Sequence, residues 1–184
     1  DTFVECRVDV PPVFDNYDEF LNAGGYASSN CGIDPGTFAF VSQVSDGNTC
    51  PETLTRNYMV EDSCGNTLRC EHLIIVHDKT PPTMDCPPDT VIAVGGSVPV
   101  PFNNYTEFVF AGGSADDNCG IDERTFNWVG DSSDGNSFPE TITRTYEVFD
   151  SCGNRAECSY LIIVEGDAQL NMECPPQMQF ECYG

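Results

Sequence analysis

Apolar and polar residues alternate along residues 141–148, which predicts a half-buried β-strand. Ile142, Tyr146 and Val148 share one face of this strand, and threonines occupy most of the other face. A period of two residues is typical of a strand that packs one side against a core. Arg144 falls on the apolar face, so we expect its side chain either to reach the rim of the sheet or to pair with a carboxylate.

Other segments predict further strands. The run Leu-Ile-Ile-Val occurs at 73–76 and again at 161–164, and such a continuous apolar run is expected of a central strand buried on both faces. We interpret residues 37–40 and 107–110 as additional short strands, separated by turns rich in Gly, Asn and Asp. No stretch shows the sustained period and caps of a helix.

The chain contains one sequence module written twice. A shift of 88 residues aligns residues 1–88 with 89–176 without a gap, and 46 of the 88 aligned pairs are identical. Such self-similarity indicates a repeat architecture. We assign residues 1–83 to a first repeat, 84–171 to a second and 172–184 to the start of a third, and we expect the chain to be a window of a longer array.

Each repeat is short and rich in strands, which sets the expected fold class. About six to eight short strands in fewer than 90 residues predict an all-β fold of tandem immunoglobulin-like β-sandwiches, rich in disulfides. Residues 77–83 would form the joint between the two sandwiches, because their two prolines stiffen the backbone and lack donors for a sheet.

Charge and cysteine content restrict the setting and the partners. The chain has 30 acidic and 7 basic residues, a net charge of −23, so its surface repels nucleic acid and anionic membranes. Eleven cysteines without the paired knuckles of zinc sites predict disulfides and an extracellular or cell-surface location. Without a run of about 18 apolar residues, we expect no membrane insertion.

The two copies act as controls for each other in pairing the cysteines. Cys6 and Cys50 are replaced together by Val94 and Phe138 in the second copy, so the simplest interpretation makes them partners. The remaining cysteines of the turns recur in both copies. In an immunoglobulin-like sandwich their two turns lie at one pole, which predicts the bridges Cys31–Cys64 and Cys119–Cys152.

The last class of cysteine follows from the expected strand order. First and last strands of such sandwiches lie side by side and parallel, which predicts a Cys86–Cys158 bridge. A bridge from Cys70 to Cys86 across the joint is the alternative. In the preferred scheme the partners of three cysteines lie outside this chain: Cys70, Cys174 and Cys182.

The motifs together resemble a known family. The chain carries, in order, CPP, DNCGID, SDGN with PETITRTY, DSCGN, and an apolar strand led by a cysteine and followed by a TPP joint. This succession resembles the hyalin-repeat (HYR-like) modules of large bacterial surface and gliding-motility adhesins. The resemblance implies an extracellular array of β-sandwiches. Val94 and Phe138 depart from the fuller cysteine pattern, so the third bridge of the second repeat is in doubt.

Few residues suggest site chemistry. His72 and His77 are five positions apart, which places them on opposite faces of a strand, and no catalytic arrangement is evident, so we expect no enzyme. Clustered oxygen ligands suit Ca²⁺, and Asp116, Asp117 and Asp150 form the candidate site. The first copy has serines in place of the first two, and Asp in a turn commonly caps its own backbone, so this alternative stays open.

Three residues match short patterns for glycan attachment. Asn104 begins an Asn-Tyr-Thr acceptor, while Thr2 and Thr90 follow aspartates in an Asp-Thr motif used for O-glycosylation in some bacteria.

The main functional hypothesis is a structural segment of an extracellular repeat adhesin or surface filament. Its partners would be neighbouring repeats of the same polypeptide or identical subunits in a fibre, with calcium as the single candidate cofactor. The alternative is a module that binds a surface glycan or protein. Trp128, the one tryptophan of the chain, is expected in the core.

Overall fold

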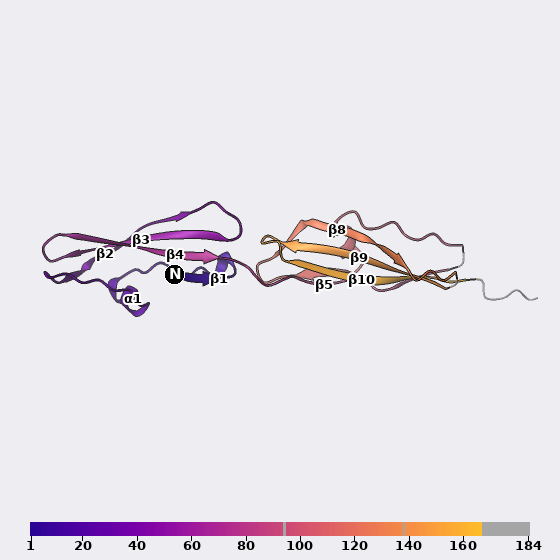
Figure 1. Ribbon diagram of the computed structural model, residues 1–184, viewed down its shortest axis with the longest axis horizontal. Coiled ribbons are helices and arrows are strands. Elements are labelled where there is room, and N and C mark those ends of the chain that lie inside the picture. The colour runs from indigo at the N-terminus through magenta and orange to yellow at the C-terminus, as the bar shows by residue number, and fades with distance from the viewer. Residues whose placement is uncertain (94, 138, 167–184) are drawn as a thin grey trace, which may run out of the picture.

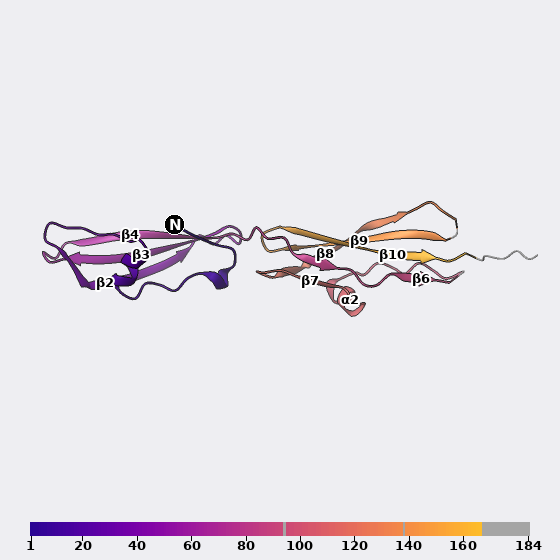
Figure 2. The same ribbon diagram turned by 90° about the horizontal axis from the view of Figure 1, so that it is seen from below.

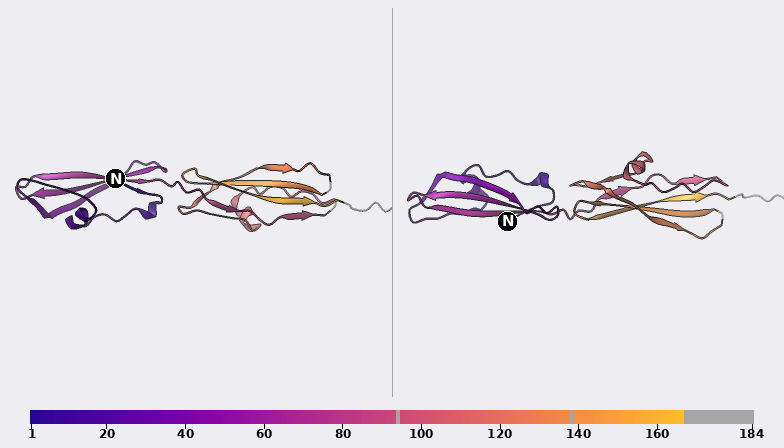
Figure 3. Two further views of the ribbon diagram at one scale, coloured as in Figure 1. Left: turned by 60° about the horizontal axis from the view of Figure 1, so that its bottom comes forward. Right: turned by 90° about the horizontal axis from the view of Figure 1, so that it is seen from above.

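The chain folds mostly into β-strands arranged as two sheets that lie end to end. A computed structural model describes residues 1–93, 95–137 and 139–166. Each sheet comes from one of the two sequence copies, and residues 77–82 connect them (Figure 1). The same separation of the two sheets along one long axis is visible from other directions (Figure 3).

The first sheet has the strand order β1-β4-β3-β2. Its strands are β1 (Thr2–Val4), β2 (Ile33–Ser45), β3 (Glu52–Asp62) and β4 (Thr67–Val76). The first strand runs parallel to the last, and the other pairs are antiparallel. A 3-10 turn, η1 (Arg7–Asp9), and a short helix, α1 (Tyr17–Asn22), lie between β1 and β2.

The second sheet repeats this arrangement and adds a small partner sheet. Its order is β6-β10-β9-β8, with β6 again parallel to β10. The strands are β6 (Thr90–Ile92), β8 (Ile121–Ser133), β9 (Glu140–Asp150) and β10 (Arg155–Val164). Helix α2 (Tyr105–Phe110) lies across from them, and a separate two-stranded sheet pairs β5 (Thr83–Asp85) with β7 (Ser114–Asp116) (Figure 2).

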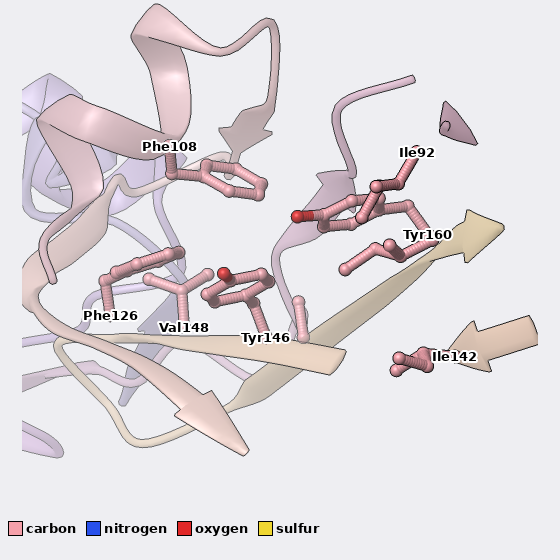
Figure 4. Packing of buried hydrophobic residues seen from close by; sticks show 9 residues of the cluster. Ile92, Phe108, Phe126, Ile142, Tyr146, Val148 and Tyr160 are labelled. Atoms are coloured by element: carbon pink, nitrogen blue, oxygen red, sulfur yellow. The ribbon is translucent and has the colours of Figure 1, made fainter. Parts of the chain in front are cut away.

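The alternating pattern places the expected faces inside. In β9, Ile142, Tyr146 and Val148 are buried and pack with Phe108 of α2 and Phe126 of β8 (Figure 4). The Leu-Ile-Ile-Val runs do form central strands, with neighbours on both edges. They are not buried on both faces as predicted, because only alternate residues, such as Ile162, are fully covered. Only two thin layers pack together here, so one face of each sheet stays partly exposed.

Two helices contradict the expectation of an all-strand module. Residues 107–110, which the pattern predicted to be a strand, belong to α2. Asn104 caps this helix by accepting a hydrogen bond from the Glu107 amide at 2.9 Å, and the Glu107 carboxylate accepts from the Asn103 amide at 2.8 Å. The Asn-x-x-Glu pattern is a capping box, and it recurs at the start of α1. One helical turn is too short to show a period, so only the cap could have revealed it.

Each sheet buries an arginine at the position where the apolar face should continue. Arg144 is 2% exposed, and its guanidinium bonds both carboxylate oxygens of Asp131 at 2.8 and 2.7 Å and the Pro99 carbonyl at 2.8 Å. Arg56 in the first sheet is similarly buried, but there Gln43 stands where the second copy has Asp131. Pairing with a carboxylate, one of the two predicted outcomes, is therefore found at Arg144.

Removing the partner of Arg144 should destabilise the second sheet strongly. The pKa of Asp131 is held below its ordinary value, chiefly by its hydrogen bond from Arg144, so the pair stabilises the fold near neutral pH. We expect Asp131→Ala to cost about 3 kcal/mol in urea unfolding under non-reducing conditions, because it leaves a buried charge uncompensated. Asp131→Gln, which copies the first sheet, should cost clearly less. Equal, small losses in both variants would contradict this view.

Candidate cation site at the joint between the two sheets

Two disulfides cross the joint and tie the sheets together. Cys6 bonds Cys119 with a Cα–Cα distance of 5.2 Å, and Cys50 bonds Cys152 with a Cα–Cα distance of 5.1 Å. The predicted pairs Cys6–Cys50 and Cys119–Cys152 are therefore wrong.

The positions of the four cysteines in the fold explain why they pair in this way. Cys6 follows β1 and Cys50 lies in the connection from β2 to β3, so both occur at the pole of the first sheet that faces the second. Cys119 precedes β8 and Cys152 lies in the turn from β9 to β10, at the facing pole of the second sheet. Cys6 and Cys50 are lost together in the second copy because they serve one pole, and not because they bond each other.

The other predicted bridges are present. Cys31 bonds Cys64 with a Cα–Cα distance of 5.9 Å, and Cys86 bonds Cys158 with a Cα–Cα distance of 5.4 Å. The latter excludes the alternative bridge from Cys70 to Cys86. Cys70 carries a free, exposed thiol within the described part of the chain, whereas Cys174, Cys182 and the predicted third repeat at 172–184 lie outside it.

Hydrogen bonds reinforce the joint between the bridges. The Asn154 side-chain amide donates to the Asp78 carbonyl at 3.1 Å, which connects a turn of the second copy to the linker. The Asn118 amide and the Thr80 hydroxyl both donate to Glu5, at 3.2 and 3.1 Å. The linker is thus held by side chains from both copies.

Two carboxylates point into this joint without a full set of partners. Asp78 is 2% exposed, and while its Oδ1 accepts from the Thr80 amide at 3.0 Å, its Oδ2 is buried with no hydrogen-bond partner among the described residues. In Asp117, Oδ1 accepts hydrogen bonds from the Cys119 and Gly120 amides, while Oδ2 is buried and has no hydrogen-bond partner among the described residues. The two carboxylates and the Cys119 sulfur lie within 4.8 Å of one another.

Of the predicted calcium ligands, the structure brings two toward the joint and leaves one out. Asp117 lines the site, and Asp150 is near enough for its charge to act on Asp117. Asp150 is 3% exposed, but its oxygens are already bonded to the Cys152 and Asn154 amides and to the Asn154 side chain. Asp116 lies in β7 with an exposed side chain, outside the cluster that contains Asp117 and Asp78.

The residue that sequence reasoning missed is Asp78. A signal for it exists in the comparison of the copies, because the position aligned with Asp78 in the second copy is Gly166. Asp117 likewise has Ser29 as its counterpart. Both acids therefore occur only where the first copy meets the second.

The first copy shows what the same turn looks like without the extra carboxylate. The Ser29 hydroxyl donates to Asp62 at 2.6 Å, and Asn66 donates to the same carboxylate. These bonds, that from Asn66 foremost, lower the pKa of Asp62 to about 2. Asp62 is thus a fully bonded anion that needs no further partner, whereas the equivalent cluster at the joint has unpaired oxygens.

The electrostatics of the joint favour a cation. Burial first, and then the charges of Asp78 and Asp150, raise the pKa of Asp117 above its ordinary value. Two nearby carboxylates of like charge, withdrawn from water, are costly unless a proton or a metal ion neutralises them. Oxygen ligands are those that Ca²⁺ prefers, and the Cys119 sulfur is committed to a disulfide, so it is no ligand.

Other candidate residues stand apart from the joint. His72 shares a hydrogen bond of 2.8 Å with Thr2, and burial lowers its pKa. Thr90 begins β6, and Asn104 is exposed at the helix cap; glycan attachment at these three sites stays a prediction. Trp128 is 42% exposed, contrary to the expected core position, and its ring nitrogen donates to Asp131 at 3.1 Å.

No protein-family model and no curated protein matches this chain. Among the described residues, no helix is long and apolar enough to cross a membrane. Four disulfides indicate that the folded chain belongs outside the reducing cytosol.

The stability of the joint should depend on pH and on divalent cations through Asp117. The folded state raises the pKa of Asp117. The stability that its protonated carboxyl group contributes is therefore fully present below the unfolded pKa and is lost as pH rises through the folded pKa. In EDTA at pH 7 we therefore expect Asp117→Ser to melt several degrees above the unmodified chain, with the difference shrinking as pH falls toward 4.

Calcium chloride at pH 7 should reverse this order, because binding to the folded state stabilises only the chain that keeps the carboxylate. The control Asp116→Ser alters a neighbouring carboxylate outside the cluster and should respond to calcium as the unmodified chain does. If thermal melts show no difference between Asp117→Ser and the unmodified chain in either buffer, the site does not bind a cation.

Proposed function

We propose that this chain is a stiff structural segment of an extracellular fibre or adhesin stalk, built from tandem immunoglobulin-like modules. The observation that carries the proposal is the pair of disulfides across the joint, Cys6–Cys119 and Cys50–Cys152. Two covalent bonds that fix one module against the next limit bending between them. A stalk benefits from this, because its reach depends on stiffness.

Three covalent connections cross the joint, which is what makes it stiff. A single linker lets two modules swing and twist, and one added bridge still leaves a hinge about the line between the two attachments. The linker and both disulfides together remove that freedom as well. Pro81 and Pro82 restrict the backbone of the linker further.

A bound cation would complete the same joint. Asp78 comes from the linker and Asp117 from the second copy, so an ion held by both would join the segments and remove the repulsion between their carboxylates. Ca²⁺ takes six to eight oxygen ligands, and waters would supply those that the two carboxylates do not. Calcium would thereby make the stiffness of the joint depend on the calcium concentration outside the cell.

Surface charge and family resemblance support the same setting. A net charge of −23 keeps the chain soluble and opposes contact with anionic membranes and nucleic acids. The HYR-like succession of motifs resembles repeats that extend surface adhesins, and it supports a cell-surface location. The partners in this proposal are neighbouring repeats or identical subunits.

Stiffness at the joint can be measured directly. We expect small-angle scattering of the unmodified chain to fit one elongated particle with a narrow distribution of maximum dimension. The quadruple variant with Cys6, Cys50, Cys119 and Cys152 changed to Ser should show a broader distribution, since only the linker then joins the sheets. The double variant Cys31→Ser, Cys64→Ser removes a bridge within the first copy and should keep the narrow distribution of maximum dimension. A compact scattering profile of the unmodified chain would contradict the stalk.

One observation favours a second candidate, the binding of a surface glycan. Trp128 is 42% exposed beside a shallow hollow lined by Val100, Phe102 and Asn127, and exposed aromatic rings are common platforms for sugars. In this case binding on a glycan array should disappear in Trp128→Ala and persist in Trp128→Phe, with an unchanged circular-dichroism spectrum. Absence of binding by the unmodified chain would remove the candidate.

A further inference from the structure

One structural part of the second copy has no counterpart among the described residues of the first copy. In the second copy β5 pairs with β7, and Met84 of β5 lies opposite Ala115 and packs against the core. The counterpart of β7 in the first copy is residues 26–28, which form no strand and have no ladder partner among the described residues. The counterpart of β5 would precede residue 1.

An open apolar groove occupies the place of the absent strand. Its volume is about 290 Å³, and residues 26–28 form one of its walls. The other walls include two aromatic residues of the first core, Phe38 and Tyr58, and one thiol, Cys70. Tyr26, on the open side, is 80% exposed.

Burial at matching positions shows what the absent strand leaves uncovered. Leu68 is 39% exposed, whereas its counterpart Ala156 is 8% exposed. Cys70 is an exposed free thiol, whereas its counterpart Cys158 is bonded to Cys86 directly after β5. The groove therefore fits a strand with an apolar residue two positions before a cysteine.

This chain carries a second segment of that sequence. The segment that covers the second copy reads Thr-Met-Asp-Cys-Pro-Pro at 83–88, and residues 171–176 read Asn-Met-Glu-Cys-Pro-Pro. The methionine and the cysteine keep their spacing, as Met172 and Cys174. Residues 171–176 lie outside the described part of the chain.

We propose that residues 171–176 of one molecule add as a strand to the groove of the first copy of a second molecule, with Met172 opposite Ala27 and Cys174 bonded to Cys70. Strand addition satisfies the free backbone groups of residues 26–28 and covers the exposed apolar side chains in one step. The register follows from the second copy, where Met84 lies opposite Ala115 and Cys86 bonds Cys158.

Residues 171–176 cannot reach the groove of their own molecule. The strand β10 ends at Val164, at the end of the molecule away from the first copy (Figure 2). Residues 70–76 and β10 both run along the long axis, one in each copy, so their summed lengths separate Cys70 from Val164 by roughly 50 Å. The ten residues from Val164 to Cys174 span only about 35 Å at full extension. Donation therefore runs from one molecule to the next and generates an open, head-to-tail fibre.

The covalent step needs an oxidant of a common class. The Cys70 and Cys174 thiols together lose two protons and two electrons and form the S–S bond, while a small-molecule disulfide such as oxidised glutathione takes them up and becomes two thiols. Partial burial of the sulfur raises the pKa of the Cys70 thiol, so exchange is faster in mildly alkaline buffer than at pH 7.

This inference rests on the proposed structural role and names its partner, and the two can fail separately. If the scattering profile shows a stiff rod but the thiols never link two molecules, strand donation fails and the stalk survives. If the monomer is compact or flexible at its joint, the stalk itself fails.

Complementary variants test the proposal on the full chain. Cys70→Ser can donate but not receive, and Cys174→Ser can receive but not donate. In a glutathione redox buffer at about pH 8.5, we expect the unmodified chain to give a ladder of multimers on non-reducing gels. Each variant alone should stay monomeric, and their mixture should give a dimer and no larger species. Mixing ¹⁵N-labelled with unlabelled chains should yield a hybrid Cys70–Cys174 peptide in mass spectrometry.

Matched controls separate strand fit from thiol chemistry. Met172→Asp should reduce the hybrid peptide at least tenfold, because it places a charge against the apolar groove, whereas Met178→Asp, a charge later in the same tail, should leave it unchanged. Cys182→Ser should multimerise as the unmodified chain does. The proposal is overturned if the unmodified chain stays monomeric with Cys70 free, if the multimers are linked through Cys182, or if Met172→Asp has no effect.

Discussion

The covalent closure of the joint is the constraint on which the rest of the molecule depends. Each copy has a thin core, in which a four-stranded sheet packs against a helical turn and a loop, and such a unit buries limited apolar surface. Bonds from Cys6 to Cys119 and from Cys50 to Cys152 close loops of about 100 residues each, so they restrict the unfolded chain as a whole and not one copy at a time. The two copies thus share one stabilising device, and the acidic residues of the joint can stay buried because the bridges hold them together.

Sequence reasoning succeeded where a single strand or a single copy decided the outcome. The alternation in β9 placed Tyr146 and Val148 in the core, and the two prolines after β4 kept the linker out of both sheets. It failed where the deciding contact lies between copies. Cys6 and Cys50 are lost together in the second copy, but the common cause is a shared pole, and a sequence does not state which pole faces which neighbour. Helix α2 was missed for another reason, since one turn carries no period and only its cap identifies it.

The candidate cation site could be predicted from the sequence only in part, because its residues also come from both sides of the joint. Asp117 and Asp150 could be chosen from the turn chemistry of the second copy, whereas Asp78 contributes a carboxylate from a linker that has no oxygen-rich motif of its own. At the joint, the differences between the copies, Gly166 against Asp78 and Ser29 against Asp117, mark the two carboxylates with an unpartnered oxygen. Ser29 against Asp117, and Gln43 against Asp131, show how one backbone tolerates a neutral or a charged partner at the same place.

The parallel pairing of the outer and last strands has a mechanical consequence. In the second copy β6 and β10 run side by side in the same direction, hydrogen-bonded from Thr90–Ile162 to Ile92–Val164. In the proposed stalk, tension along the axis would tend to slide these two parallel strands past each other and load their hydrogen bonds together. The Cys86–Cys158 bridge joins the chain just before β6 to β10, so it carries this tension covalently and shields the hydrogen bonds. The short strand β6, with three residues, therefore does not have to withstand extension by itself.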